Sequence, residues 1–442
     1  MIASSCVSPI ISPASGHLLE TSHVNLSVGN PWIPGRFAHA NLQIADTTAP
    51  LEFFAKNGYY IVKDKIYRHK LYAMQAATKL GLGPKGLTWI FNDRFYSALD
   101  WQRPSRIPLT TLYRMRAQQL RDKYDYLMLM FSGGADSTTA LHSFVLNNIH
   151  LDEVVVSWPV TQTAGRYNPS ESRAPENFSS EWDYAIRPRL KWLEANFPRI
   201  KITILDTMAQ LDAQEDREDT ATITMKHTYN SIQRGRDLDN LVAERQRQHP
   251  NSAAVVGVDS PIVYIVGSDV YSAFIDTRGL GWASDYTLQG LERNVEYFFW
   301  SPDLPELPLE QAHVILDHVN HHPASRAFLP AGPYNPLANI DMRNHSMDAY
   351  RLFIKPLLYP TFDPKIVQVD KNPDELGHSR WFHWFYDNPH STDVLVPWES
   401  AIRAEQNLIH EDFFFRNEHG RIINYRFCWS LKYKLGSLIQ HQ

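Results

Sequence analysis

The most informative stretch of this sequence is YLMLMFSGGADSTTALHSFVLN, which spans residues 126–147. Residues 126–131 form a continuous apolar run, as expected of a central parallel strand that is covered on both faces. A Gly-Gly turn follows, and residues 137–147 then predict a helix, because their apolar side chains recur at helical spacing. The stretch therefore predicts a strand, a tight turn and a helix, which is the repeating unit of an α/β fold.

Strands and helices continue to alternate after this unit. Apolar runs at residues 151–158, 201–205 and 253–258 predict three more strands, and residues 182–195 and 208–247 supply helical sequence between them. Two short runs at residues 262–266 and 270–275, joined by Gly267-Ser268-Asp269, predict a hairpin. We therefore expect an α/β domain with a doubly wound, mostly parallel sheet flanked by helices.

Composition divides the chain into four parts. Residues 1–50 are rich in Ser, Pro, Asn and Ala and predict an extended leader. Residues 51–122 predict an α+β segment with a strand at 59–62, a helix at 65–79 and an amphipathic helix at 109–121. The α/β domain occupies residues 123–289. Residues 290–442, which are rich in Pro and aromatic side chains, predict a separate and largely helical region.

Bulk composition argues against several classes of protein. A formal net charge of −5 over 442 residues gives no general attraction to nucleic acid, although a tRNA or DNA substrate in a local basic groove stays open. Cys6 and Cys428 are too few for a disulfide framework or a four-thiolate metal site. The sequence has no apolar run of about 18 residues that would predict a membrane span, and residues 1–16 lack the pattern of a secretory signal. We therefore expect a cytoplasmic protein.

The turn at residues 132–137, Ser-Gly-Gly-Ala-Asp-Ser, has the chemistry of a phosphate site; we name it the SGGADS loop. Its glycine pair lets the backbone approach a ligand without interference from Cβ. The N-terminus of the following helix favours phosphate, and Ser132 and Ser137 add hydroxyl donors. Asp136 is suited to hold Mg²⁺, which offsets phosphate charge. The plain alternative is a capped strand-to-helix turn; a Walker A loop is excluded, because its spacing and lysine are absent.

The SGGADS loop resembles the SGGxDS signature of the N-type ATP pyrophosphatase, or PP-loop, superfamily, which includes asparagine, GMP and NAD synthetases, tRNA-thiolating enzymes and phosphoadenylylsulfate reductase. The resemblance implies a Rossmann-like sheet of the adenine nucleotide alpha hydrolase type, with ATP and Mg²⁺ as cofactors. It also implies that ATP is cleaved between its α and β phosphates and that the substrate is adenylated. On this basis pyrophosphate and Mg²⁺ are assigned to Ser132, Gly133, Gly134, Ala135, Asp136 and Ser137.

The same resemblance implies roles outside the loop. Backbone groups of Val156 and Ser157 would hold adenine, although both also suit a plain core strand. Asp259 follows the fourth strand, at the edge where open α/β sheets bind ligands, with a strand-terminal turn as the alternative. Arg278 is the preferred cation for the departing pyrophosphate. Further candidate cations, each of which also suits a solvated surface, are Lys226, Arg234, Arg236 and Lys355.

A closer resemblance covers most of the chain. Residues 116–137 (RAQQLRDKYDYLMLMFSGGADS), 295–307 (VEYFFWSPDLPEL), 310–315 (EQAHVI) and 427–436 (FCWSLKYKLG) are similar to PP-loop proteins of tailed bacteriophages. Those proteins are labelled asparagine-synthase-like or phosphoadenylylsulfate-reductase-like. The resemblance implies work in the host cytoplasm if a phage encodes the chain, and it says little about the substrate.

Three further groups of residues have both a functional and a plain interpretation. His318 and His322 have the i, i+4 spacing of metal ligands, but the HExxH context is absent and we favour a helix end with histidines near its dipole. The aromatic runs at 296–300 and 381–386 suit a core or a partner surface better than base stacking. Cys428 suits a buried thiol better than a sulfur carrier, because the Glu-Cys-Gly-x-His pattern of the reductases is missing.

The leading hypothesis is therefore an ATP-dependent ligase that adenylates a small-molecule or nucleoside substrate, which ammonia or an amine then attacks. Position 2 is Ile2, whereas asparagine synthetase exposes a cysteine at its processed N-terminus, so a built-in glutaminase is not expected. One alternative is sulfur transfer or reduction, which the scarcity of cysteine weakens. Another is a nucleotide-binding interaction protein without turnover. The sequence leaves open whether the chain forms a homo-oligomer.

Overall fold

The structure is a computed structural model, and it describes a set of separate ranges of the chain. These are residues 22–23, 43–45, 58–68, 70–158, 160, 164–165, 182–206, 231–257, 262–266, 276–280, 295–322, 324–325, 353–360, 362, 414–416, 422–425, 433 and 435–436.

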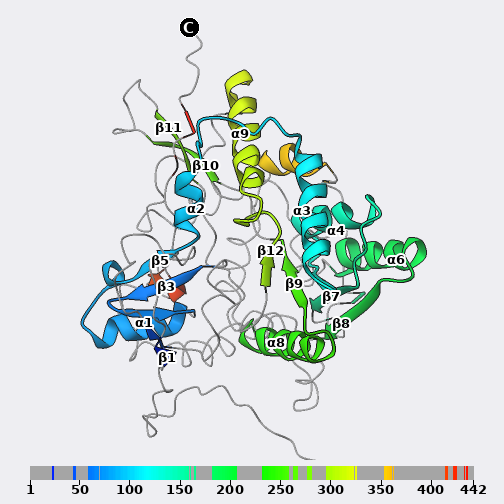
Figure 1. Cartoon of the computed structure of the whole chain (residues 1–442), viewed down its shortest axis with the longest axis horizontal. Helices are drawn as coiled ribbons and strands as arrows, with labels where there is room; N and C mark the ends of the chain where they lie inside the picture. The colour runs from blue at the N-terminus through cyan, green and yellow to red at the C-terminus, as the bar shows by residue number, and fades with distance from the viewer. Residues whose placement is uncertain are drawn as a thin grey trace, which may run out of the picture.

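The centre of the fold is a five-stranded sheet whose neighbouring strands are all parallel (Figure 1). The strands are β6 (Tyr126–Met130), β7 (Glu153–Trp158), β8 (Lys201–Asp206), β9 (Ser252–Val256) and β12 (Val295–Tyr297), in the order β12-β9-β6-β7-β8. The first strand in the chain, β6, therefore lies in the middle, and the order reverses between β6 and β9. This is the order of a doubly wound sheet, and the expected Rossmann-like α/β fold is confirmed.

Helices cover both faces of this sheet. α4 (Ala135–Val145) connects β6 to β7, and α6 (Arg187–Asn196) connects β7 to β8. α8 (Ser231–Gln248) runs from β8 back to β9. Figure 1 shows α4 and α6 on one side of the sheet, together with α3 (Leu109–Lys123), and α8 on the other side. Right-handed crossovers require this arrangement, because the chain changes direction across the sheet after β8.

Two local predictions in this domain need correction. α6 is preceded by η6 (Trp182–Ile186), a single π-helical turn, so the helix expected over 182–195 is not uniform. The expected hairpin exists, but β10 (Ile262–Val266) pairs with β11 (Asp276–Leu280) and not with residues 270–275. β11 reads Asp-Thr-Arg-Gly-Leu, and only one of these residues is β-branched, so the sequence carried no strand signal there.

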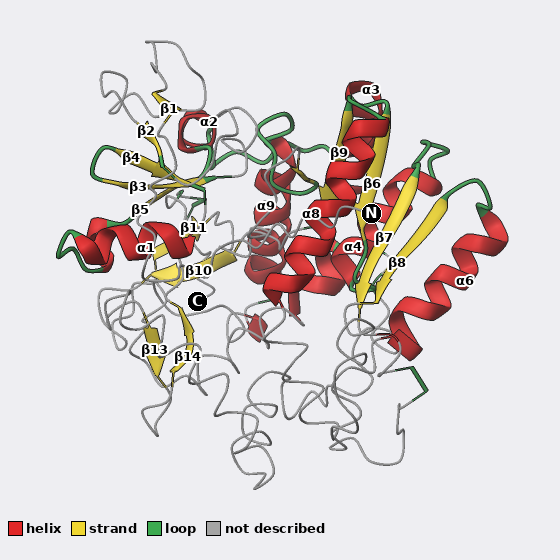
Figure 2. Cartoon of the chain, turned by 90° about the horizontal axis from the view of Figure 1, so that it is seen from below, coloured by secondary structure: helices red, strands yellow, loops and turns green. Residues whose placement is uncertain are grey.

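A smaller sheet lies beyond the β12 edge of the parallel sheet (Figures 1 and 2). It contains β1 (Ser22–His23), β2 (Gln43–Ile44), β3 (Tyr59–Val62), β4 (Lys65–Tyr67) and β5 (Thr88–Ile90), in the order β1-β2-β4-β3-β5. β1 and β2 fall within the expected leader of residues 1–50. The N-terminal segment also contains α1 (Lys70–Lys79), η4 (Pro84–Gly86) and α2 (Asp93–Ala98).

The prediction of a helix over residues 65–79 is wrong at its start, because α1 begins at Lys70. Residues 65–67 form β4, which pairs antiparallel with β3 through the tight turn at Lys63 and Asp64. Lys63 has a φ of 54°, a left-handed conformation that usually falls to Gly or Asn in such turns. Because neither residue type is present, the hairpin had no recognisable turn signal.

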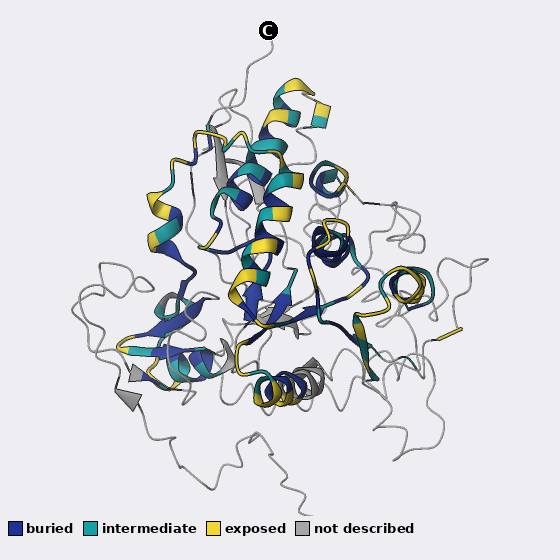
Figure 3. Cartoon of the chain, turned by 45° about the vertical axis from the view of Figure 1, so that its right-hand side comes forward, coloured by how far each residue is buried: buried dark blue, intermediate teal, exposed yellow. Residues whose placement is uncertain are grey.

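Aromatic side chains join the two sheets into one core. Phe91, which follows β5, lies 5.7 Å from Trp300 and 6.1 Å from Tyr297 between ring centroids. Residues 297–300 are all buried, so the run EYFFW is core. Trp101 stacks on Tyr433 with centroids 4.6 Å apart, which ties the C-terminal end to the N-terminal segment. Figure 3 shows the buried strands at the centre of this core.

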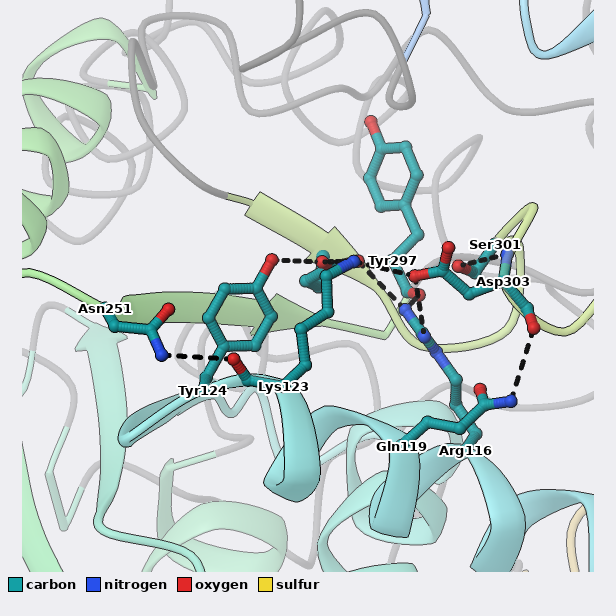
Figure 4. Close-up of polar contacts among 9 residues, drawn as sticks. Arg116, Gln119, Lys123, Tyr124, Asn251, Tyr297, Ser301 and Asp303 are labelled. Atoms are coloured by element: carbon teal, nitrogen blue, oxygen red, sulfur yellow. Dashed lines mark hydrogen bonds and ion pairs between the residues drawn. The ribbon is translucent and has the colours of Figure 1, made fainter. Parts of the chain in front are cut away.

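The expected boundary at residue 289 does not separate the parallel sheet from the C-terminal region. β12 lies after this boundary, yet it pairs with β9 in the parallel sheet. A buried polar network then fixes β12 to α3 (Figure 4). Arg116 Nη2 lies 3.0 Å from Glu296 Oε2 and donates to the carbonyl oxygen of Tyr297 at 2.9 Å. The side chains of Arg116 and Glu296 are 0% and 1% exposed, so both charges are removed from water.

Lys123, Tyr124 and Asp303 complete this network. Lys123 Nζ lies 3.2 Å from Glu296 Oε1 and 2.9 Å from Asp303 Oδ2, and the Tyr124 hydroxyl donates to Glu296 Oε1. Burial raises the pKa of Tyr124, and the neighbouring Glu296 carboxylate raises it further. The network thus joins the segments RAQQLRDKYDY and VEYFFWSPDLPEL, which are far apart in the sequence.

A second buried ion pair anchors α8 to the other face of the sheet. Arg245 of α8 contacts both oxygens of Glu153 at 2.7 and 3.1 Å, and the Tyr126 hydroxyl donates to the same carboxylate at 2.8 Å. Burial raises the pKa of Glu153, but hydrogen bonds from Arg245, Thr203 and Tyr126 outweigh burial and hold the pKa below its usual value. Glu153 begins β7, so this anchor lies at the end of the sheet opposite the SGGADS loop.

Beyond β12 the described residues contain both helix and strand. α9 (Glu306–His321) packs against α3, and residues 353–358 are helical. β13 (Phe414–Arg416) and β14 (Ile422–Tyr425) form an antiparallel pair. Among the helices that the structure describes, none combines the length and the apolar character needed to span a bilayer.

Candidate functional site

The SGGADS loop connects the C-terminal end of β6 to the start of α4. Gly133 has a φ of 77°, a left-handed conformation that glycine adopts without strain. Gly134 is the N-cap residue of α4, and the N–H of Thr138 donates to its carbonyl oxygen at 2.9 Å. Ser132 is exposed and Asp136 is half-buried, so both side chains can be reached from solvent. The N–H groups of the first turn point out of the end of α4, as in any helix.

The two serine hydroxyls of the loop have different environments. Ser137 is buried, and its Oγ accepts from the Ser132 N–H at 3.3 Å and donates to the Gly134 carbonyl oxygen at 3.2 Å. The Ser132 hydroxyl lies 3.2 Å from the same Oγ but is exposed. Ser137 therefore closes the loop on itself, whereas Ser132 faces outward. We expected both hydroxyls to serve phosphate, and the geometry favours only Ser132 in that role.

β7 brings backbone groups to one side of the loop. The carbonyl oxygen of Val155 accepts from the Phe131 N–H at 2.8 Å, so odd-numbered residues of β7 turn their backbone groups towards β6. The carbonyl oxygen of Asp152 accepts from the Lys201 N–H at 2.9 Å, so even-numbered residues face β8. Of the two residues assigned to adenine, Ser157 thus faces the space above the end of β6, while the backbone of Val156 faces β8.

β9 brings a glycine to the other side of the loop. The carbonyl oxygen of Val256 accepts from the Phe298 N–H at 2.9 Å, so this residue faces β12. The next residue, Gly257, consequently turns its backbone towards the SGGADS loop. The loop therefore lies between Ser157 and Gly257 at the point where the strand order reverses.

η6 packs directly on the loop. A Cβ atom added to Gly133 would lie 2.8 Å from Ile186 Cγ1 and 3.2 Å from the Ile186 backbone nitrogen. We expected a side chain at position 133 to obstruct the approach of phosphate. The structure instead directs it into η6, so this glycine is required for packing between the loop and η6.

The Asp136 carboxylate acts on the neighbouring helix α3. Tyr113 of α3 is buried, and its hydroxyl donates to the Leu358 carbonyl oxygen at 2.7 Å and accepts from Gln311 at 3.1 Å. Burial raises the pKa of Tyr113, the Gln311 hydrogen bond lowers it, and the negative charge of Asp136 raises it further. The negative charge of Asp136 is thus within electrostatic range of Tyr113.

Further along α4, His142 is held in its neutral form. Burial and the nearby positive charge of Arg189 lower the pKa of His142 to about 4. Its ring contacts Trp192 of α6, with ring centroids 5.2 Å apart. His142 therefore contributes no charge to α4 at neutral pH.

Neither a model of a known protein family nor a curated protein sequence matches the chain.

Several predicted site residues lie outside the described part of the structure. These are Asp259, Lys226 and Cys428, together with the aromatic run at 381–386. Arg278 lies in β11 opposite Tyr264, but its side chain is outside the described part, and its role stays a prediction. Arg234 and Arg236 lie in the first turns of α8. α8 packs against β9, the strand that follows it.

The histidines of α9 contact other groups of the protein. His313 lies 2.9 Å from the Trp101 carbonyl oxygen, and the rings of His318 and His322 are 4.5 Å apart at the end of the helix. This agrees with the helix end that we favoured. Within the described residues, no group of three or more His, Cys, Asp or Glu side chains is arranged to hold a metal ion. Lys355 lies in the helical segment 353–358.

The sequence interpretation placed Gly257 at the end of the fourth strand, on the ligand-binding edge, but it did not predict the contact of Gly257 with the loop, and it missed Ile186. Gly257 directly follows an apolar strand, and a glycine at that place is a recognisable sign of close backbone approach. Ile186 had no such sign, because an isoleucine in a helical stretch predicts only core packing. Both residues come from segments that the sheet topology brings to the end of β6.

Proposed function

We propose that this chain is an ATP-dependent enzyme of the PP-loop type, which adenylates a small-molecule or nucleoside substrate and releases pyrophosphate. The position of the SGGADS loop carries the proposal. The loop follows the central strand β6 where the strand order reverses, and open α/β sheets bind ligands in the crevice at this point. The N-terminus of α4 lies at the same end of β6 and favours phosphate.

Each side of the loop suits a different part of ATP. The backbone N–H groups at the start of α4 and the exposed hydroxyl of Ser132 suit phosphate oxygens. On the other side, the backbone of Ser157, with one donor and one acceptor, turns towards the space above the end of β6. Adenine presents a matching donor and acceptor along its edge. ATP is therefore expected to lie across β6, with its phosphates over α4 and its base over β7.

Mg²⁺ fits this arrangement. It is a hard cation that proteins bind through one or two carboxylates together with the phosphates of the substrate. Asp136 supplies a half-buried carboxylate in the first turn of α4. When bound, Mg²⁺ offsets the negative charge of the phosphates.

The proposed reaction has two steps. An oxygen of the substrate attacks the α-phosphorus of ATP, the bond between this phosphorus and the α–β bridging oxygen breaks, and pyrophosphate leaves with the electron pair. Ammonia or an amine then attacks the adenylated carbon, AMP leaves, and the nitrogen releases a proton to solvent. In the first step the N–H groups of α4 act on the charge that grows on the departing pyrophosphate, and this is where they lower the barrier.

The test is product analysis with α-labelled ATP and Mg²⁺. The full chain is incubated with pools of carboxylic acids, amides and nucleosides, and the labelled products are separated. We expect AMP, with an equal amount of pyrophosphate, in at least one pool. Asp136→Asn should lower this turnover at least about 100-fold, since loss of even an outer partner of a metal costs 10–100-fold. Labelled ADP, or ATP binding without turnover in every pool, would contradict the proposal.

A further inference from the structure

The end of β9 touches the first turn of α4 at Gly257. A Cβ atom built on Gly257 would lie 3.3 Å from the backbone nitrogen of Ser137 and 3.4 Å from the carbonyl carbon of Asp136. Both atoms belong to the peptide bond between Asp136 and Ser137. Because they are backbone atoms, they have no rotamer by which to move aside.

The first turn of α4 also has little freedom to retreat. Ser137 is buried and its hydroxyl is bound within the loop, and Ile186 of η6 closes the loop from the side of Gly133. Nearly all of the remaining residues of α4 are buried as well. A side chain at position 257 must therefore displace the turn by a few tenths of an ångström.

The φ angle of Gly257 lies outside the left-handed region that favours glycine. Alanine can therefore adopt this backbone conformation, so backbone strain does not account for the glycine. What a side chain would change is the distance between β9 and α4. The contact thus ties this glycine to the geometry of the SGGADS loop.

We propose that Gly257 is a positioning residue. Because it has no side chain, β9 packs close to the first turn of α4, and this close packing places the N–H groups of the turn where they bind the pyrophosphate of ATP. This inference rests on the proposed function. Gly257 acts through the peptide bond of Asp136 and Ser137, and its own backbone faces the loop from the β9 side. An added methyl group would shift the phosphate donors while leaving the adenine side of the site, at Ser157, in place.

The size of the effect follows from the displacement. A misplacement of about 1 Å costs roughly 100-fold, so a shift of a few tenths of an ångström is expected to cost about three- to tenfold. The displaced N–H groups bind phosphate before the reaction as well as during it. The loss should therefore appear in the Kd of Mg·ATP and of Mg·pyrophosphate, and also in kcat, because the same N–H groups stabilise the charge that grows on the leaving pyrophosphate.

The first experiment titrates Gly257→Ala and the wild-type chain with Mg·ATP and with Mg·pyrophosphate by calorimetry. Both Kd values should rise three- to tenfold, and the urea midpoint should fall, because a side chain forced against packed backbone destabilises the fold. Gly81→Ala is the matched control, because Gly81 has a φ of 65° and no atom within 4 Å of an added Cβ. It should lower the urea midpoint without changing either Kd. Unchanged Kd values in Gly257→Ala would overturn the inference.

A second experiment uses the wild-type chain, so it does not depend on how the variant folds. The 20 glycines are labelled with ¹⁵N, and Mg·pyrophosphate is added. The signals of Gly133, Gly134 and Gly257 should shift together, while that of Gly81 stays in place. A Gly257 signal that stays in place while Gly133 and Gly134 move would overturn the positioning role. If none of the three moves, the proposed function itself fails.

Discussion

The buried ion pair of Arg116 and Glu296 holds β12 against α3, and Glu296→Gln tests its contribution to stability. This substitution removes the negative charge and preserves the shape of the side chain. Arg116, which is 0% exposed, would retain the Tyr297 carbonyl oxygen at 2.9 Å and Asp303 Oδ2 at 3.6 Å. The buried charge of Arg116 would then face only the more distant carboxylate of Asp303, instead of the carboxylates of both Glu296 and Asp303.

The expected loss follows from these remaining contacts. Removing one partner of a buried ion pair costs about 3–5 kcal/mol, because an uncompensated charge stays inside the protein. Asp303 and the Tyr297 carbonyl oxygen compensate part of the charge, so we expect the lower end, about 3 kcal/mol of unfolding free energy. At roughly 2–4 °C per kcal/mol for domains of 150–250 residues, the melting temperature should fall by about 6–12 °C.

The assay is urea unfolding followed by tryptophan fluorescence, in which the buried Trp300 reports on this part of the core. Lys123→Ala is the matched control: Lys123 contacts the same two carboxylates but is 44% exposed, so it should cost about 0.2–1 kcal/mol. The triple variant Arg116→Met/Tyr124→Phe/Glu296→Leu replaces the charges and the hydroxyl with apolar groups and should recover most of the loss. The reasoning is refuted if Glu296→Gln costs no more than Lys123→Ala.

Three more predictions concern other parts of the molecule. Gly133→Ala should lower the unfolding free energy by about 2–3 kcal/mol in urea, through its left-handed φ and its contact with Ile186; wild-type stability would contradict the packing role. The folded pKa of His142, about 4, lies below its unfolded value of about 6.5, so the stability due to its neutral form is present above pH 6.5 and is lost as the pH falls towards 4. In His142→Leu the urea midpoint should therefore fall less than in the wild type between pH 7 and pH 4.5. A fall as steep as that of the wild type would count against this role of His142. Tyr433→Ala should cost about 3–5 kcal/mol by removing the ring stacked on Trp101, whereas Tyr433→Phe should cost far less; equal losses in a urea titration would show that the ring does not provide the stabilisation.

The parallel sheet could be predicted because its strands carry strong local signals. Residues 127–131 and 154–156 are apolar throughout, as expected of strands covered on both faces, and the helices between strands have helical periodicity. β12 escaped prediction because only three of its residues pair with β9, and the aromatic residues after it suit a core of any kind. β4 escaped because the left-handed residue of its turn is Lys63.

The SGGADS loop could be predicted, whereas its surroundings could not. Gly-Gly between an apolar strand and a helix is a local signal that needs no tertiary information. The contacts of Gly133 with Ile186 and of Gly257 with Ser137 depend on how η6 and β9 pack around β6. Backbone groups along β7 face β6 and β8 alternately, and which residues face β6 depends on the register of the three strands. This register turns the backbone of Ser157, and not that of Val156, towards the loop. These relations follow from tertiary structure, and a single sequence does not contain them in readable form.

A crystal structure of the chain with Mg²⁺ and a non-hydrolysable ATP analogue is the most direct measurement of the central claim. We expect β- and γ-phosphate oxygens about 3 Å from backbone nitrogens at the start of α4, with Asp136 on the metal and adenine beside Ser157. A nucleotide bound elsewhere on the molecule, with the end of β6 holding only solvent, would contradict the account.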